Sequence, residues 1–113
     1  MTIEYKNQGF SLTTTNLTTV LTIDASSRAL VKSAPITNEH TANILVEAYI
    51  TDSSAGTDYE FFHNDQAKDT TENMVSNVLV LEEGDSIKVQ ASVANTAKGV
   101  ISYALINRSQ ENG

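Results

Sequence analysis

The sequence of 113 residues contains no cysteine, so disulfides, thiolate zinc sites and cysteine nucleophiles are excluded. This absence fits folding in a reducing cytoplasm. Only seven lysine and arginine residues oppose fourteen aspartate and glutamate residues, which gives a formal net charge of −7. Because nucleic acids and anionic membranes are bound through clustered basic side chains, the composition argues against both kinds of partner.

Long hydrophobic runs are also lacking. No apolar stretch is long enough to span a bilayer, and the start of the chain, Met1 to Lys6, lacks the basic and apolar regions of a signal peptide. Apolar residues still make up 40% of the chain, which is enough for a core at this length. We therefore expect one domain over residues 1–113, ending in a short polar tail at residues 108–113.

Motifs for catalysis or cofactor binding are missing from the pattern of residues. No serine lies in a G-x-S-x-G elbow, and the five glycines are scattered rather than grouped in a phosphate-binding loop. His40 and His63 have none of the spacings that build a zinc site. The acidic segment 82–85 is typical of a structural turn and lacks the calcium-binding EF-hand pattern. We predict no enzymatic activity, no catalytic residue, no cofactor and no bound metal.

Apolar and polar residues alternate with the period of a β-strand, and helical periodicity is absent. The alternation is clearest in residues 86–93 and 43–52. A shift of one residue in either segment would turn every apolar side chain into water, so the register of both strands is well determined. We expect the core to include Ile44, Val46, Ile50, Ile87, Val89, Ala91 and Tyr103.

Further strands are expected where β-branched and apolar residues lie between turn-forming residues. These segments are residues 18–24, 29–36, 58–63, 77–81 and 100–106, with residues 10–14 as a candidate edge strand. Residues 66–73 fit one helical turn or a loop. Pro35 cannot donate a backbone hydrogen bond, so it should lie at an edge or a bulge. The pattern predicts an all-β, antiparallel β-sandwich of about 7–8 short strands, of the jelly-roll or Ig-like type.

Three aromatic residues, Tyr59, Phe61 and Phe62, gather in one expected strand. Consecutive side chains on a strand point to opposite faces, so Phe61 and Phe62 should lie on different sides of the sheet. One ring would fill the core. The other would be covered either by loop residues or by a second protein, because aromatic residues are enriched in protein interfaces. These three residues are our candidate interface.

Four segments of the chain carry a resemblance to a known group of proteins. They are Ala29-Leu-Val-Lys-Ser33, the segment from Ala42 to Ser54, the segment from Val80 to Ser92 with its Leu-Glu-Glu-Gly-Asp turn, and Val100-Ile-Ser-Tyr103. In these segments the chain resembles small β-sandwich structural and accessory proteins of bacteriophage virions. Many members of that group carry a Pro-Ala-Gly turn where this chain has Asp24-Ala25-Ser26, so the match weakens towards the N-terminus.

The resemblance implies both a location and a mode of action for the protein. It implies a structural component of a bacteriophage virion, either an accessory or decoration protein or a connector-type protein of the capsid or the head–tail (neck) region. Such a protein would act by assembling with other virion proteins, as a homo-oligomer or in symmetric copies, after synthesis in the host bacterial cytoplasm. The alternatives are a tail or baseplate protein, or a β-sandwich module that binds host glycans.

Overall fold

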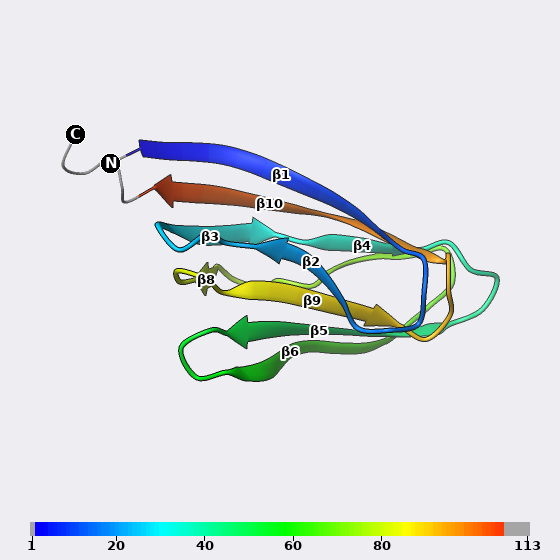
Figure 1. Ribbon diagram of the computed structural model, residues 1–113. Helices are drawn as coiled ribbons and strands as arrows, with labels where there is room; N and C mark the ends of the chain where they lie inside the picture. Colours follow the sequence, from blue (N-terminus) through cyan, green and yellow to red (C-terminus); the bar gives the residue numbers. More distant parts are fainter. Residues whose placement is uncertain (1, 108–113) are drawn as a thin grey trace.

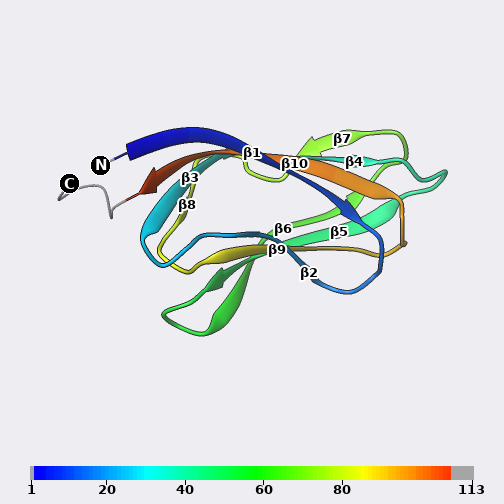
Figure 2. The same cartoon turned by 45° about the horizontal axis from the view of Figure 1, so that its top comes forward.

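The computed structural model describes residues 2–107, which form two antiparallel β-sheets packed face to face (Figures 1 and 2). The all-β sandwich predicted from the sequence is confirmed. No helix occurs in these residues, and so none that is long and apolar enough to cross a membrane. The strands are β1 (Thr2–Leu12), β2 (Thr18–Thr22), β3 (Ser27–Ser33), β4 (Pro35–Asn38), β5 (Ile44–Asp52), β6 (Thr57–Gln66), β7 (Thr71–Asn73), β8 (Leu79–Leu81), β9 (Ser86–Ala91) and β10 (Ala97–Asn107).

The strand order is that of a jelly roll. In the first sheet β10 pairs on one side with β1 along its whole length, and on the other side with β4 and β3. β4 pairs in turn with β7, and β3 pairs with β8. The second sheet has the order β2–β9–β5–β6. The chain is thus a single long hairpin with its tip between β5 and β6, and each strand before the tip pairs with its counterpart after it. Rolled into two sheets, this nested pairing makes the jelly roll rather than the Ig-like alternative.

The strand β1 departs most from expectation. The sequence predicted only a candidate edge strand at residues 10–14, whereas β1 begins at Thr2 and runs for 11 residues. Residues 2–9 are all exposed and mostly polar, so they carry no alternation that would signal a strand. The backbone pairing with β10, in regular register from Thr2 to Leu12, holds this segment in place.

Two shorter segments also differ from the expectation. The predicted strand 29–36 is split at Ala34 into β3 and β4, and Pro35 is the first residue of β4, a position that tolerates proline. Residues 71–73, expected as part of a helical turn or loop, form the short strand β7 against β4. These splits raise the number of strands to ten. The predicted tail, residues 108–113, lies outside the described residues.

The core lies between the two sheets and contains the residues that alternation predicted. Of the seven predicted core residues, six are buried, and Ile50 is half-buried and packs against the others. Large side chains from both sheets fill the interior, including Leu12, Ile36, Leu81, Ile87 and Ile101.

Gly99 in β10 allows close packing of β1 and β4. A Cβ atom on Gly99 would lie 2.5 Å from Cζ of Phe10 and 2.8 Å from the backbone oxygen of Pro35. Only glycine leaves room for the aromatic ring here.

Two buried amides tie the loops at one end of the sandwich. Asn38 is fully buried, and its Nδ2 donates hydrogen bonds to the backbone oxygens of Ala42, Gln66 and Ala67 at 3.1–3.2 Å. The Gln66 side chain donates to the backbone oxygens of Ile36 and Thr70, both at 2.9 Å. These bonds replace part of the backbone pairing that irregular loops lack.

Candidate interaction surfaces

The aromatic strand β6 contains a β-bulge that changes the expected placement of its rings. Ala48 of β5 pairs with Phe62 and the next residue, Tyr49, pairs with Glu60, so Phe61 is an extra residue. Phe61 and Phe62 are both half-buried and both pack against the core. The expectation that they face opposite sides is therefore wrong, because a bulge interrupts strict alternation.

Tyr59 is the aromatic residue of β6 that stays open to solvent, with 53% of its surface exposed. Phe61 lines a pocket of about 130 Å³ together with residues 74–79. This volume is below the several hundred cubic ångströms typical of small-molecule sites. Tyr59, Phe61 and Phe62 remain a predicted protein interface, in which Tyr59 offers the largest free surface.

The first sheet presents a second apolar surface, which the sequence analysis did not single out. Tyr5 lies opposite Ala104 of β10, Ala104 lies opposite Leu30 of β3, and Leu30 lies opposite Val80 of β8. The residues on either side of these in β3, β8 and β10 belong to the core or pack against it, so this row lies on the opposite face of the sheet. The next row adds Ile3 opposite Ile106. We call this surface the outer patch, and its members are Ile3, Tyr5, Leu30, Val80, Ala104 and Ile106.

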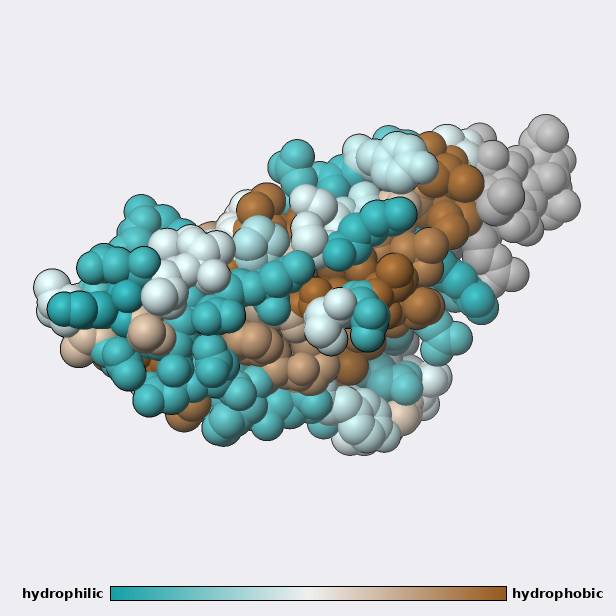
Figure 3. All heavy atoms as spheres, turned by 180° about the vertical axis from the view of Figure 1, so that it is seen from behind, coloured by the Kyte–Doolittle hydropathy of each residue, from teal (hydrophilic) through white to brown (hydrophobic). Residues whose placement is uncertain are grey.

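Half of the outer patch is exposed to solvent, namely Ile3, Tyr5 and Val80, whereas Leu30 and Ile106 are half-buried and Ala104 is buried between its neighbours. The exposed fractions are 52% for Ile3, 82% for Tyr5 and 51% for Val80. Seen from behind, hydrophobic residues gather towards the end of the molecule where β1 begins (Figure 3). Because contiguous apolar patches on small proteins mark contact sites, the outer patch is the strongest candidate docking surface in residues 2–107.

On the outer side of the second sheet, a charged cluster joins β5 and β6. His63 Nδ1 lies 3.2 Å from Glu60 Oε2 and 3.5 Å from Glu47 Oε2. The Tyr49 hydroxyl donates a hydrogen bond to Glu47 Oε2 at 3.1 Å. Strand pairing brings these residues together, since Glu47 is opposite His63 and Tyr49 is opposite Glu60. Sequence spacing alone did not show this cluster, because Glu47 comes from another strand.

The cluster shifts the pKa values of its members. The hydrogen bond with Glu60 raises the pKa of His63, and the same bond lowers the pKa of Glu60. The hydrogen bond to Glu47 raises the pKa of Tyr49 to about 12. In the described part of the chain, Glu47, Glu60 and His63 are also the one group that could offer three ligand atoms to a metal ion. Their mutual ion pairs already account for the arrangement.

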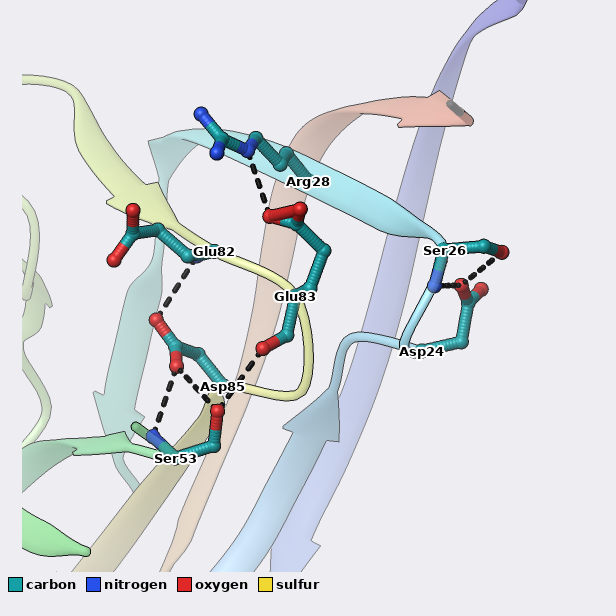
Figure 4. Close-up of polar contacts among 7 residues, drawn as sticks. All are labelled: Asp24, Ser26, Arg28, Ser53, Glu82, Glu83 and Asp85. Atoms are coloured by element: carbon teal, nitrogen blue, oxygen red, sulfur yellow. Dashed lines mark hydrogen bonds and ion pairs between the residues drawn. The ribbon is translucent and has the colours of Figure 1, made fainter. Parts of the chain in front are cut away.

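The acidic turn between β8 and β9 is a structural joint (Figure 4). The Asp85 side chain is buried, and it accepts hydrogen bonds from the backbone N–H of Glu82 at 2.9 Å and of Ser53 at 3.0 Å. Gly84 has a φ of +82°, which strongly favours glycine. This turn is the Leu-Glu-Glu-Gly-Asp segment on which part of the virion resemblance depends, and its glycine and last aspartate have conformational roles.

Neighbouring contacts brace the same end of the sandwich. Arg28 Nε donates to Glu83 Oε1 at 2.7 Å, and this bond raises the pKa of Arg28. The Asp24 carboxylate accepts from the backbone N–H and the hydroxyl of Ser26, both at 2.9 Å, which lowers the pKa of Asp24. Figure 4 shows these groups as turn-stabilising pairs. A pocket of about 260 Å³ at this end is lined by Ser53, Ser54, Glu82, Glu83 and Asp85.

His40, the other histidine considered in the sequence, lies in the loop after β4. Its backbone N–H donates to Asn38 Oδ1 at 2.8 Å. The contact involves the main chain of His40 rather than its imidazole, so it explains the loop conformation.

Comparisons by sequence give no relatives: no protein-family model matches the chain, and no curated protein matches it. Comparison by structure gives clear neighbours. A chain of the T13 particle of infectious bursal disease virus matches with a TM-score of 0.58 and 11% identity, over 95% of this chain and 31% of that one. A chain from the acid-stable capsid of the Helicobacter pylori bacteriophage KHP30 matches with a TM-score of 0.56 and 13% identity, over 94% of this chain and 88% of that one.

A third neighbour does not come from a virus. The Drosophila NLP-core, described as forming pentamers and binding histones, matches with a TM-score of 0.58 and 12% identity, over 90% of this chain and 99% of that one. At these identities the comparisons show a shared fold. This chain is thus similar in fold to viral capsid chains, and it spans about a third of the bursal virus chain and most of the phage and NLP chains.

Proposed function

We propose that this protein is a structural component of a bacteriophage virion. It acts as an accessory, decoration or connector-type protein of the capsid or neck, through assembly rather than catalysis. The observation that carries the proposal is the outer patch, an apolar row across four strands of a jelly-roll sheet. In an isolated protein such an apolar surface stays in contact with water, whereas a protein bound to a repeated scaffold buries it.

The fold and the sequence support the same proposal. The jelly roll is similar to a chain of a bacteriophage capsid over nearly the whole length of both. The sequence resemblance to phage virion proteins falls on the strands and turns that build this jelly roll. Symmetric copies on a shell would multiply weak contacts into firm attachment, so a patch of modest area suffices.

The test is to locate the protein in particles. Phage particles encoded by the same genome are purified and separated into heads and tails, and each fraction is analysed by quantitative mass spectrometry. We expect the protein in the head or neck fraction in multiple copies per particle. Recovery with tails would favour the baseplate alternative, and absence from intact particles would refute the virion role.

The NLP-core neighbour favours a second candidate, an oligomeric module that binds basic proteins. The net charge of −7 is compatible with a basic partner. This candidate predicts salt-sensitive binding to a purified basic protein in solution, together with absence from virions. The virion role predicts the opposite outcome in both measurements.

A further inference from the structure

The sheet edges of this protein are protected unequally. Edge strands carry unpaired backbone N–H and C=O groups, and proteins guard them by shortness, bulges or proline. β7 and β8 have three residues each, and β2 and β6 each contain a register shift. β1 has 11 residues, no proline and no register shift. Within residues 2–107 it pairs only with β10, so its other edge is open (Figure 1).

The only charged residues of β1 are Glu4 and Lys6. Both are exposed, and neither forms an ion pair or hydrogen bond with another described residue. Their charges are opposite, and both side chains lie on the same face of the strand because they are two residues apart. An antiparallel partner strand that fits this edge should therefore place a basic residue opposite Glu4 and an acidic residue opposite Lys6.

A second copy of β1 meets that requirement in one antiparallel register. When the two-fold axis passes at Tyr5, Glu4 of each copy lies opposite Lys6 of the other, and the two Tyr5 side chains face each other. A register centred on Glu4 places like charges opposite each other, and so does one centred on Lys6. Cross-strand opposite charges and aromatic pairs stabilise antiparallel strands, and like charges destabilise them. The register centred on Tyr5 uses residues 2–8, all of which are exposed.

We propose that two copies of this protein associate through antiparallel pairing of β1 with β1, in the register centred on Tyr5, so that their first sheets join into one continuous sheet. This inference rests on the assembly role proposed above and names a partner for it, a second copy. The joined sheet would also bring the two outer patches side by side, since Tyr5 belongs to both the edge and the patch. The interface is isologous, as a two-fold dimer requires.

A charge-swap experiment tests the pairing. Glu4→Lys and Lys6→Glu each place like charges opposite each other twice, and the double variant restores opposite charges. Self-association is measured by sedimentation velocity over a range of concentrations, and thermal unfolding checks that each variant is folded. We expect each single variant to weaken dimerisation by roughly tenfold or more, and the double variant to recover it. Equal association of all four proteins, or a wild-type protein that is monomeric throughout, would overturn the proposal.

Cross-linking tests the register without relying on charge. The chain has no cysteine, so single cysteines can be introduced into a clean background. Tyr5→Cys places two cysteines directly opposite each other, at a separation that a disulfide can bridge with a small adjustment. We expect mild oxidation to convert Tyr5→Cys into a covalent dimer and to leave the control Ser11→Cys monomeric. Equal yields for the two variants would contradict the register.

The outcome is separable from that of the virion test. A protein found in heads that does not dimerise through β1 refutes the pairing and leaves the virion role intact. A β1 dimer that is absent from particles refutes the virion role alone.

Discussion

The Asp85 carboxylate accepts a hydrogen bond from the backbone N–H of Ser53 at 3.0 Å and so joins two turns that are 32 residues apart. Asp85 is buried and also holds the backbone N–H of Glu82. Replacing it with alanine leaves two partly buried backbone N–H donors without this acceptor. We expect Asp85→Ala to lower the free energy of unfolding by about 2–4 kcal/mol, measured by chemical denaturation. The control Glu82→Gln keeps the backbone donor and should change stability by less than about 0.5 kcal/mol. Equal losses would show that the turn does not depend on Asp85.

The two glycines where β1 meets β10 should respond differently to alanine. At Gly99 the added Cβ would overlap the Phe10 ring and the Pro35 backbone, whereas at Gly9 the nearest atom lies 4.0 Å away. We expect Gly99→Ala to cost about 1–3 kcal/mol of unfolding free energy through overpacking. Gly9→Ala should stay within about 0.5 kcal/mol of the wild type. Urea denaturation of both variants provides the comparison, and a tolerated Gly99→Ala would contradict the packing described.

Phe61 and Phe62 should both behave as core residues, because the bulge in β6 turns both rings towards the interior. Phe61→Ala and Phe62→Ala should each lower the free energy of unfolding by about 2–4 kcal/mol, less than for fully buried rings. Tyr59→Ala removes a side chain that is 53% exposed and should affect stability least. If either phenylalanine variant kept full stability and lost only assembly, that ring would belong to an interface.

Stability should depend on pH through His63. Because the folded state raises the pKa of His63, its ion pairs stabilise fully below the ordinary value of 6.5, and this contribution is lost as the pH rises through the raised pKa. The pKa of Glu60 is lowered, so its contribution is lost only as the pH falls below 4.5. We therefore expect the melting temperature of the wild type, relative to His63→Gln, to fall as the pH rises above the ordinary histidine value of 6.5. Parallel melting curves for the two proteins would show that the cluster contributes nothing.

Docking through the outer patch predicts a loss of incorporation when the patch becomes charged. Val80→Lys places an ammonium group at the β8 end of the apolar row, at a residue that is 51% exposed and therefore tolerant for folding. We expect fewer copies per particle, counted by mass spectrometry after complementation of a phage that lacks the gene. Thr22→Lys, at an exposed position of the other sheet, is the matched control. A normal copy number for Val80→Lys would exclude the outer patch as the docking surface.

Alternation predicted what depends on burial. Residues 44–52 and 86–91 form central strands of a sheet, where one face must be apolar. The alternation of apolar and polar residues therefore predicted that Val46 and Val89 are buried. The strand β1 was missed because an exposed edge strand needs only backbone pairing, which leaves no mark on side-chain polarity. The rings of Phe61 and Phe62 were placed wrongly for a related reason. A β-bulge inserts one extra residue, which changes the face of the sheet that the neighbouring side chains occupy, and it leaves no signal in the sequence. The cluster around His63 depends on strand register, which a single sequence does not specify.

The nested pairing of the strands sets the order in which the fold can be completed. β1 precedes every other described strand, yet its partner β10 is the last of them. During synthesis β1 therefore leaves the ribosome long before its own partner exists, with both of its edges open. Closing such a distant pair makes folding slow compared with that of helical domains of similar size. A chain that is crowded with its own copies at that stage can meet another β1 before it meets its own β10, so the amount made per cell and the speed of translation should both influence how much protein folds correctly.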